Sequence, residues 1–385
     1  MAQSEWRDWA NLSDGPAGLI AELVLANDVV DYLRLRAVCR PWRRCTTDPH
    51  GHSTLDRRFH PRHWIMLREQ ISTPLSRRFI NVSTGECIML ELPELQDHRL
   101  EPTPEGLLLV IHNCTRIQLL NPFTRHLAEL PPLNTLIHPN WCSYFFRDGN
   151  FTGCGSGTTS DSKSFVVCIP DFRIIGIAKP GDESWMVVKY TSSENEPTMM
   201  FLGNFYHISE SNLMVLKTSA DRPPQPPEIV AKLHNKVNIL SDSVHLVDND
   251  GELMLVHRTR PGDSRRRYDV YRLDLDKRAL FTVDSFDGRA MFMGNGFSFF
   301  VSQQVSRCII SDTIYLSFDL PERTYNDIEA YHLPDRSIKT ANYILDQSVS
   351  RKKKDMPWPH TIVDCLSLCD TSRLYSETLC FDGIF

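Results

Sequence analysis

The sequence has no hydrophobic run of the length that a membrane-spanning helix needs, which is about 20 residues. Its longest apolar runs, such as Leu107–Ile111, have the length of a β-strand. The first residues also lack the basic start and apolar core of a secretory signal. We therefore expect a protein that does not bind or span a membrane and that resides in the cytoplasm, the nucleus or both.

Paired cysteines are missing as well. The 11 cysteines are odd in number and scattered, and they never form a Cys-x-x-Cys pair. Cys365 and Cys369 are four residues apart, but no second pair and no nearby histidine pair completes a zinc site. The 14 histidines show no His-Glu-x-x-His spacing. The sequence thus predicts reduced cysteines, no metal site and no cofactor.

The composition contains no excess of positive charge. The formal net charge of −6 excludes a general attraction to nucleic acid, so no nucleic-acid partner is expected. Apolar residues make up 41% of the 385 residues, which is enough for a substantial hydrophobic core. This length accommodates one large domain and a small one.

The N-terminal segment has the pattern of short helices. Leu19, Ile20, Leu23 and Val24 form an apolar stripe at helical spacing. Asp28 is a candidate N-cap for a second helix, and Arg40-Pro41 ends that helix and opens a third, short turn.

These helices carry more large apolar side chains than about 35 residues can bury among themselves. The surplus either docks on the rest of the chain or binds a partner as a helical hook, and composition leaves both alternatives open.

After Trp64 the sequence changes to short apolar or alternating runs separated by turn residues, as in β-strands. Val244–Val247 and Glu252–Val256 flank an Asp-Gly turn and predict a hairpin. Turn-centred units recur every 40 to 60 residues or so, which favours a β-propeller of about six blades. A pair of packed β-sheets is the alternative fold.

One glycine-rich stretch, Gly153–Gly157, is a candidate phosphate-binding loop. Such a loop needs a following Lys-Ser/Thr or the start of a helix, and Thr158–Ser162 supplies neither. We interpret the stretch as a surface loop. No nucleophile or acid–base pair stands out elsewhere, so the sequence predicts a chain that is not itself an enzyme.

Three N-terminal segments, Asn11-Leu12, Leu19–Leu23 and Asp31–Arg43, resemble an F-box of the kind found in grass F-box proteins, in which a tryptophan such as Trp9 precedes the box. An F-box is a three-helix hook that binds a Skp-type adaptor and thereby joins a cullin-RING ubiquitin ligase. The resemblance assigns adaptor binding to Leu12, Leu19, Ile20, Leu23, Val24, Leu33, Val38, Cys39 and Trp42.

The likeness continues into the β-rich part. The segments that carry it are Ser243–Val247, Glu252–Arg258, Tyr268–Asp274, Arg289–Gly296, Asp312–Leu316 and Trp358-Pro359. Together with the F-box they resemble the plant F-box proteins that have a C-terminal KIB-type β-propeller, a domain long catalogued as having unknown function. The fold class expected is mainly β with a small α N-terminal domain. The expected boundaries are an F-box at 9–50, a linker at 51–63 and a propeller at 64–380.

The resemblance implies the substrate-recognition subunit of an SCF-type ubiquitin ligase, in which the propeller holds a protein target for degradation. The first half of the box departs from the family pattern, because Ser13 replaces a proline and Pro16-Ala17 replace two leucines. The alternatives are a propeller interaction protein whose degenerate F-box does not engage a ligase, and a propeller enzyme. Convergent acidic or histidine side chains in the propeller channel would favour the enzyme.

Overall fold

The computed structural model describes most of the chain. The described residues are 9, 12–67, 75–95, 98–113, 115–142, 152–159, 162–190, 197–209, 211–217, 226–233, 237, 242–259, 267–294, 298–316, 329–340, 366 and 374–375. Cys365, Cys369 and the Trp358-Pro359 motif lie outside them. Among the described residues, no helix combines the length and the apolar character needed to cross a membrane.

Three helices form the N-terminal part: α1 (Asp14–Asn27), α2 (Val29–Val38) and α3 (Arg40–Arg44). Asp28 separates α1 from α2 and caps α2 as predicted, because its Oδ1 accepts hydrogen bonds from the backbone N–H groups of Val30 and Asp31 at 2.6 and 3.2 Å. Pro41 lies in the first turn of α3, where no intrahelical N–H is needed. We call residues 14–44 the helical head.

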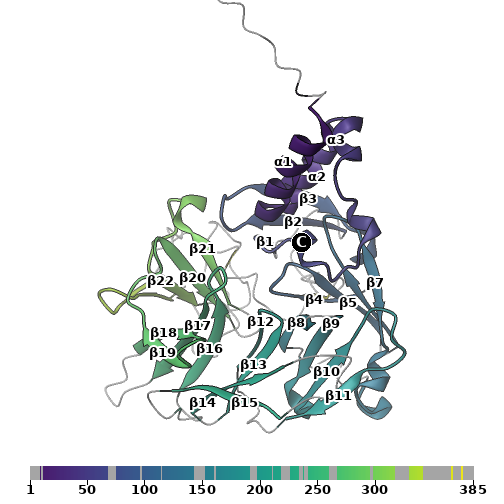
Figure 1. The fold of residues 1–385 in the computed structure, drawn as a ribbon. Coiled ribbons are helices and arrows are strands. Elements are labelled where there is room, and N and C mark those ends of the chain that lie inside the picture. The colour runs from purple at the N-terminus through teal and green to yellow at the C-terminus, as the bar shows by residue number, and fades with distance from the viewer. Residues whose placement is uncertain are drawn as a thin grey trace, which may run out of the picture.

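The rest of the described chain is a ring of six β-sheets, which Figure 1 shows in sequence order around a centre. Blade 1 contains β1 (Trp64–Met66), β2 (Ser76–Asn81) and β3 (Cys87–Glu91); blade 2 contains β4 (Arg99–Pro102), β5 (Leu108–Asn113), β6 (Arg116–Leu120), β7 (Leu127–Leu130) and the late strand β25 (Leu374–Tyr375). Blade 3 contains β8 (Thr152–Thr159), β9 (Ser162–Ile169), β10 (Ile174–Ala178) and β11 (Met186–Lys189); blade 4 contains β12 (Thr198–Phe201), β13 (Asn204–Ser209), β14 (Asn212–Leu216) and β15 (Glu228–Lys232). Blade 5 contains β16 (Ser243–Asp248), β17 (Leu253–Thr259), β18 (Arg267–Asp274) and β19 (Ala279–Thr282); blade 6 contains β20 (Arg289–Met293), β21 (Phe299–Ser302), β22 (Thr313–Leu316), β23 (Glu329–His332) and β24 (Ser337–Thr340).

The predicted fold class is confirmed: the chain is mainly β, with a six-bladed propeller behind a small helical region. The alternative of two packed sheets is wrong. Nearly all neighbouring strands are antiparallel, and the exception in the described chain is the parallel pair β20–β22 in blade 6.

The hydrophobic core lies between the blades. Six clusters, counted over the described residues, are each shared by two neighbours: blades 1 and 2, 2 and 3, 3 and 4, 4 and 5, 5 and 6, and 6 and 1. The last of these closes the ring, where Ile80 of blade 1 packs in one cluster with Phe292 of blade 6. The Ser302 backbone N–H also donates to the Val82 carbonyl oxygen at 3.0 Å. Each blade therefore buries both of its faces, which explains the continuous apolar runs in the sequence.

The hairpin predicted at the Asp-Gly turn is present as β16 and β17. The interpretation of Gly153–Gly157 as a surface loop is wrong, because these residues belong to β8. A Cβ atom at Gly155 would lie 2.8 Å from Glu105 Oε1 and 2.8 Å from Met200 Cβ. Glycine occurs in this strand because two other blades approach its backbone closely.

Candidate functional site

The helical head stands on the edge of the ring beside β2 and β3 (Figure 1). One side of it faces the propeller. Ala21, Leu25 and Tyr32 are at most 5% exposed and share a cluster with Trp64 and Leu108 of the propeller. Part of the apolar surplus predicted from the sequence therefore docks on the chain's own β-sheets.

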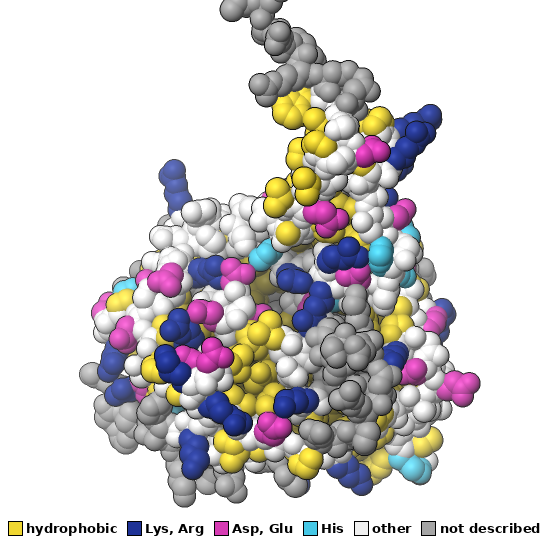
Figure 2. All heavy atoms as spheres, viewed as in Figure 1, with side chains coloured by type: hydrophobic (Ala, Val, Ile, Leu, Met, Phe, Trp, Pro, Cys, Tyr) yellow, Lys and Arg dark blue, Asp and Glu magenta, His cyan; other side chains and the backbone are white. Residues whose placement is uncertain are grey.

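The other side of the helical head faces away from the propeller. Leu19, Leu23 and Val38 are 70%, 72% and 65% exposed, and Ile20 is 38% exposed. Figure 2 shows yellow side chains gathered along one side of the projecting head. We call Leu19, Ile20, Leu23 and Val38 the outer face. The remaining residues of the predicted adaptor-binding set are half-buried: Leu12, Val24, Leu33, Cys39 and Trp42.

These half-buried residues do not all belong to the outer face. Val24 packs against the inner cluster that joins the head to the blades. Trp42 is connected to the segment that precedes α1, because its indole Nε1–H donates to the Trp9 carbonyl oxygen at 3.0 Å. Trp9 itself is 55% exposed. Trp9 therefore adds a further exposed apolar side chain to the N-terminal part of the chain.

Asp28 joins the head to the ring. Its Oδ1 caps α2, and its Oδ2 accepts hydrogen bonds from Trp64 Nε1 at 2.8 Å and from Asn81 Nδ2 at 3.0 Å. Trp64 begins β1 and Asn81 ends β2, and both are buried. The sequence identified Asp28 as a cap, but its second role depends on partners 36 and 53 positions away.

The segment 51–63, which precedes β1, packs against blades 2 and 3. Leu55 is fully buried in the cluster of blades 2 and 3, and the Phe59 carbonyl accepts a hydrogen bond from Asn121 Nδ2 at 2.8 Å. Pro61 lies so close to Gly106 that a Cβ atom there would be 2.3 Å from the Pro61 carbonyl oxygen. The head is therefore attached to the ring through contacts along much of this segment.

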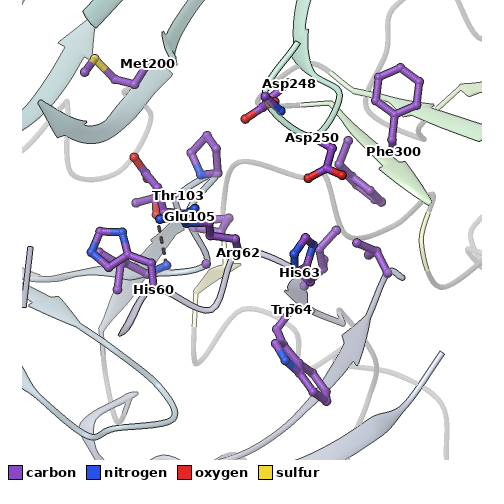
Figure 3. Close-up of a pocket in the computed structure, with 18 of the residues that line it drawn as sticks. His60, Arg62, His63, Trp64, Thr103, Glu105, Met200, Asp248, Asp250 and Phe300 are labelled. Carbon is purple, nitrogen blue, oxygen red and sulfur yellow. Dashed lines mark hydrogen bonds between the residues drawn. The ribbon is translucent and has the colours of Figure 1, made fainter. Parts of the chain in front are cut away.

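The same segment forms one wall of a pocket of about 550 Å³. Blades 1, 2, 4, 5 and 6 supply the other walls, so the pocket lies at the mouth of the ring. Figure 3 shows Arg62, His63 and Glu105 on the side of this segment and blade 2, with Asp248 at the end of β16 and Asp250 in the turn that follows it on the opposite side. We call it the mouth pocket.

Ser156 of β8 forms hydrogen bonds with two ionisable residues of the mouth pocket, Glu105 and Arg57. Its backbone N–H donates to Glu105 Oε1 at 2.8 Å, and its carbonyl accepts from Arg57 Nη2 at 3.2 Å. Glu105 Oε2 is buried and makes no hydrogen bond to the described residues. Burial raises the pKa of Glu105, and the hydrogen bonds from Ser156 oppose that rise without cancelling it.

Histidine and acidic side chains do line the pocket, which is the feature that would favour an enzyme. His60 cannot act as an acid or base near neutral pH, because burial lowers its pKa to about 3. Asp250 is held in an ion pair with Arg289 at 3.0 Å. Within the described ranges, no group of three His, Cys, Asp or Glu side chains is placed to hold a metal ion. Apolar side chains such as Trp64, Met200 and Phe300 line the pocket beside these polar groups.

His60 makes the stability of the fold dependent on pH. In the unfolded chain a histidine binds a proton near pH 6.5, whereas in the folded chain His60 has a pKa of about 3. The unfolded state therefore binds more protons between these values, so stability falls as the pH falls below 6.5, by about 2 kcal/mol at pH 5. We expect His60→Gln to reduce the slope of the free energy of unfolding between pH 6.5 and pH 5, measured by urea denaturation. An unchanged slope would contradict this assignment.

The comparison with protein families identifies the class of the chain. Residues 79–340 match the KIB1-4 beta-propeller family, and the chain belongs to that family. The match supports the predicted KIB-type propeller. The KIB1-4 propeller family is not a known enzyme class.

Two further comparisons add little. No curated protein matches the sequence. Among solved structures, dihydro-heme d1 dehydrogenase NirN is 12% identical with a TM-score of 0.29, and the match covers 57% of this chain and 48% of that one. YCF48 from Cyanidioschyzon merolae is 10% identical with a TM-score of 0.30 (58% and 86% covered), and the fission yeast SREBP-SCAP binding domains are 8% identical with a TM-score of 0.29 (63% and 91% covered). The chain thus spans about half the length of the NirN chain, and similarities this weak say nothing about function.

Proposed function

We propose that this KIB1-4 propeller protein is a substrate receptor of an SCF-type cullin-RING ubiquitin ligase. The helical head binds a Skp-type adaptor and through it a cullin, and the propeller holds a protein target. The receptor contributes no catalytic group: it raises the local concentration of the target's lysines near a charged ubiquitin-conjugating enzyme. This role places the protein in the cytoplasm, the nucleus or both.

The observation that carries the proposal is the two-sided packing of the helical head. Its inner side is buried on blades 1 and 2, while the outer face leaves three large aliphatic side chains at least 65% exposed. Burying one such side chain in a partner contributes about 1.5–3 kcal/mol. A cluster of this kind on a short projecting element is typical of a protein-binding surface.

The junction between head and ring also supports this role. Asp28 and the buried residues of segment 51–63, such as Leu55 and Phe59, hold the head in a fixed orientation relative to the propeller. A receptor with a fixed orientation presents its target in a defined position, which is what proximity catalysis requires.

A binding assay with a purified Skp-type adaptor tests the proposal. We expect wild-type protein to bind, and Leu23→Asp to weaken binding about tenfold or more because an acidic group replaces an apolar contact. Trp42→Ala should also reduce binding. Ile338→Asp in β24 is the matched control, because Ile338 is a 46% exposed aliphatic residue in the outermost strand of blade 6, and it should bind like wild type.

The alternative is an interaction protein that does not engage a ligase. It is favoured by the start of α1, where Pro16 is exposed and Ala17 is buried in place of the two leucines typical of the F-box family. Failure of the wild-type protein and of all variants to bind any Skp-type adaptor would support this alternative and contradict the ligase role.

A further inference from the structure

The mouth pocket contains two arginines whose hydrogen-bonding capacity is largely unused. Arg57 donates to the Ser156 carbonyl oxygen at 3.2 Å, and Arg62 donates to the Arg57 carbonyl oxygen at 2.9 Å. A guanidinium has five N–H donors. In the part of the chain that the structure describes, neither guanidinium forms an ion pair.

The two arginines lie close enough to affect each other. Burial lowers the pKa of Arg57, the nearby Glu105 opposes that change, and the positive charge of Arg62 adds to it. Two like charges at the mouth of a concave site are unfavourable until an anion neutralises them. Figure 2 shows dark blue side chains around the hollow beneath the helical head.

None of the acidic groups of the pocket forms an ion pair with Arg57 or Arg62 within the described residues, although Glu105 acts electrostatically on Arg57 and Arg62 acts on Asp248. Glu105 Oε1 accepts a hydrogen bond from the Ser156 backbone N–H, and burial raises the pKa of this carboxyl group. Asp250 pairs with Arg289 at 3.0 Å. Asp248 lies on the opposite wall, at the end of β16 (Figure 3), where its Oδ1 accepts a hydrogen bond from the Gly251 backbone N–H at 2.7 Å and its second oxygen can accept one from the far end of a ligand.

We propose that the mouth pocket binds an oxyanion, a phosphate or carboxylate group, between Arg57 and Arg62. The ligand carries N–H or O–H donors at its other end, where Asp248 lies. Arginine is suited to this role because its planar fork makes two parallel hydrogen bonds to such groups. A small anionic molecule or an acidic or phosphorylated side chain of a bound protein can both supply this chemistry. Anion binding at this site does not require the adaptor, so a test of anion binding is independent of a test of the ligase role.

Calorimetric titration of the full chain tests the site. The probes are inorganic phosphate, a short phosphoserine peptide with following backbone N–H groups, and the same peptide without the phosphate. We expect wild-type protein to bind phosphate and the phosphopeptide, more weakly as salt is raised. Arg62→Gln should raise both dissociation constants about tenfold or more, because one charged bidentate contact is lost.

The matched control is Arg58→Gln. Arg58 directly follows Arg57 in the sequence, yet it pairs with Asp56 at 2.8 Å and does not line the pocket. Its replacement removes the same charge, so it should leave both dissociation constants within about twofold of wild type. Arg57→Gln serves as a second variant, with the thermal unfolding of each variant compared with wild type.

The titrations also distinguish the source of the anion. A phosphopeptide that binds about tenfold more tightly than phosphate, with no binding of the unphosphorylated peptide, supports a protein side chain as the ligand. Equal affinity for the two supports a small anion. Absence of binding by phosphate and phosphopeptide to wild type, or an equal loss in Arg58→Gln and Arg62→Gln, would overturn the proposal.

Discussion

Replacing Gly106 with alanine should destabilise the protein by about 3–5 kcal/mol. Gly106 has a φ of +80°, which costs any other residue energy, and its added Cβ would lie 2.3 Å from the Pro61 carbonyl oxygen. The Pro61 carbonyl oxygen can move away from the new Cβ atom only if its backbone shifts, and Pro61 and the preceding His60 are both buried. Denaturation with urea, followed by tryptophan fluorescence, measures the change.

Gly288→Ala is the matched control for this substitution. Gly288 has nearly the same φ, +82°, but a Cβ there would meet nothing within 4 Å. It should cost only the conformational penalty, about 1–2 kcal/mol. Equal destabilisation by the two substitutions would show that the segment 51–63 does not pack against blade 2 as described.

Replacing Asp28 with alanine should cost about 2–4 kcal/mol. The substitution removes the cap of α2 and leaves the buried donors Trp64 Nε1 and Asn81 Nδ2 without their acceptor. The free energy of unfolding should fall, and hydrogen exchange should accelerate in α1 and α2 more than in blades 3 to 5.

Asp28→Asn separates the two roles of this side chain. Its amide oxygen can still cap α2. Its NH₂ group, however, faces the N–H donors of Trp64 and Asn81 and cannot accept hydrogen bonds from them. We expect it to lose most of the stability that Asp28→Ala loses. If Asp28→Asn were as stable as wild type, the contribution of Asp28 would be that of a helix cap alone.

The sequence predicted the elements whose determinants are local. The β16–β17 hairpin follows from its Asp-Gly turn, and the start of α2 follows from Asp28. Six blades could be expected because strand and turn signals repeat along the chain.

The features that the sequence did not predict depend on distant partners. The glycines of Gly153–Gly157 and the polar run that follows them indicate a surface loop, whereas in the structure these residues form β8, to which Glu105 and Met200 approach closely at Gly155. The mouth pocket could not be predicted, because its walls come from five blades and the segment 51–63. The opposite exposures of Leu23 and Leu25 also depend on which side of α1 meets blades 1 and 2.

The central claim is that a Skp-type adaptor covers the outer face of the helical head. Leucine methyl NMR spectra of the full chain, with and without the adaptor, test it most directly. The account predicts that the methyl signals of Leu19 and Leu23 shift on binding while those of the buried Leu25 and Leu108 do not. Unchanged signals of Leu19 and Leu23 in the presence of saturating adaptor would contradict it.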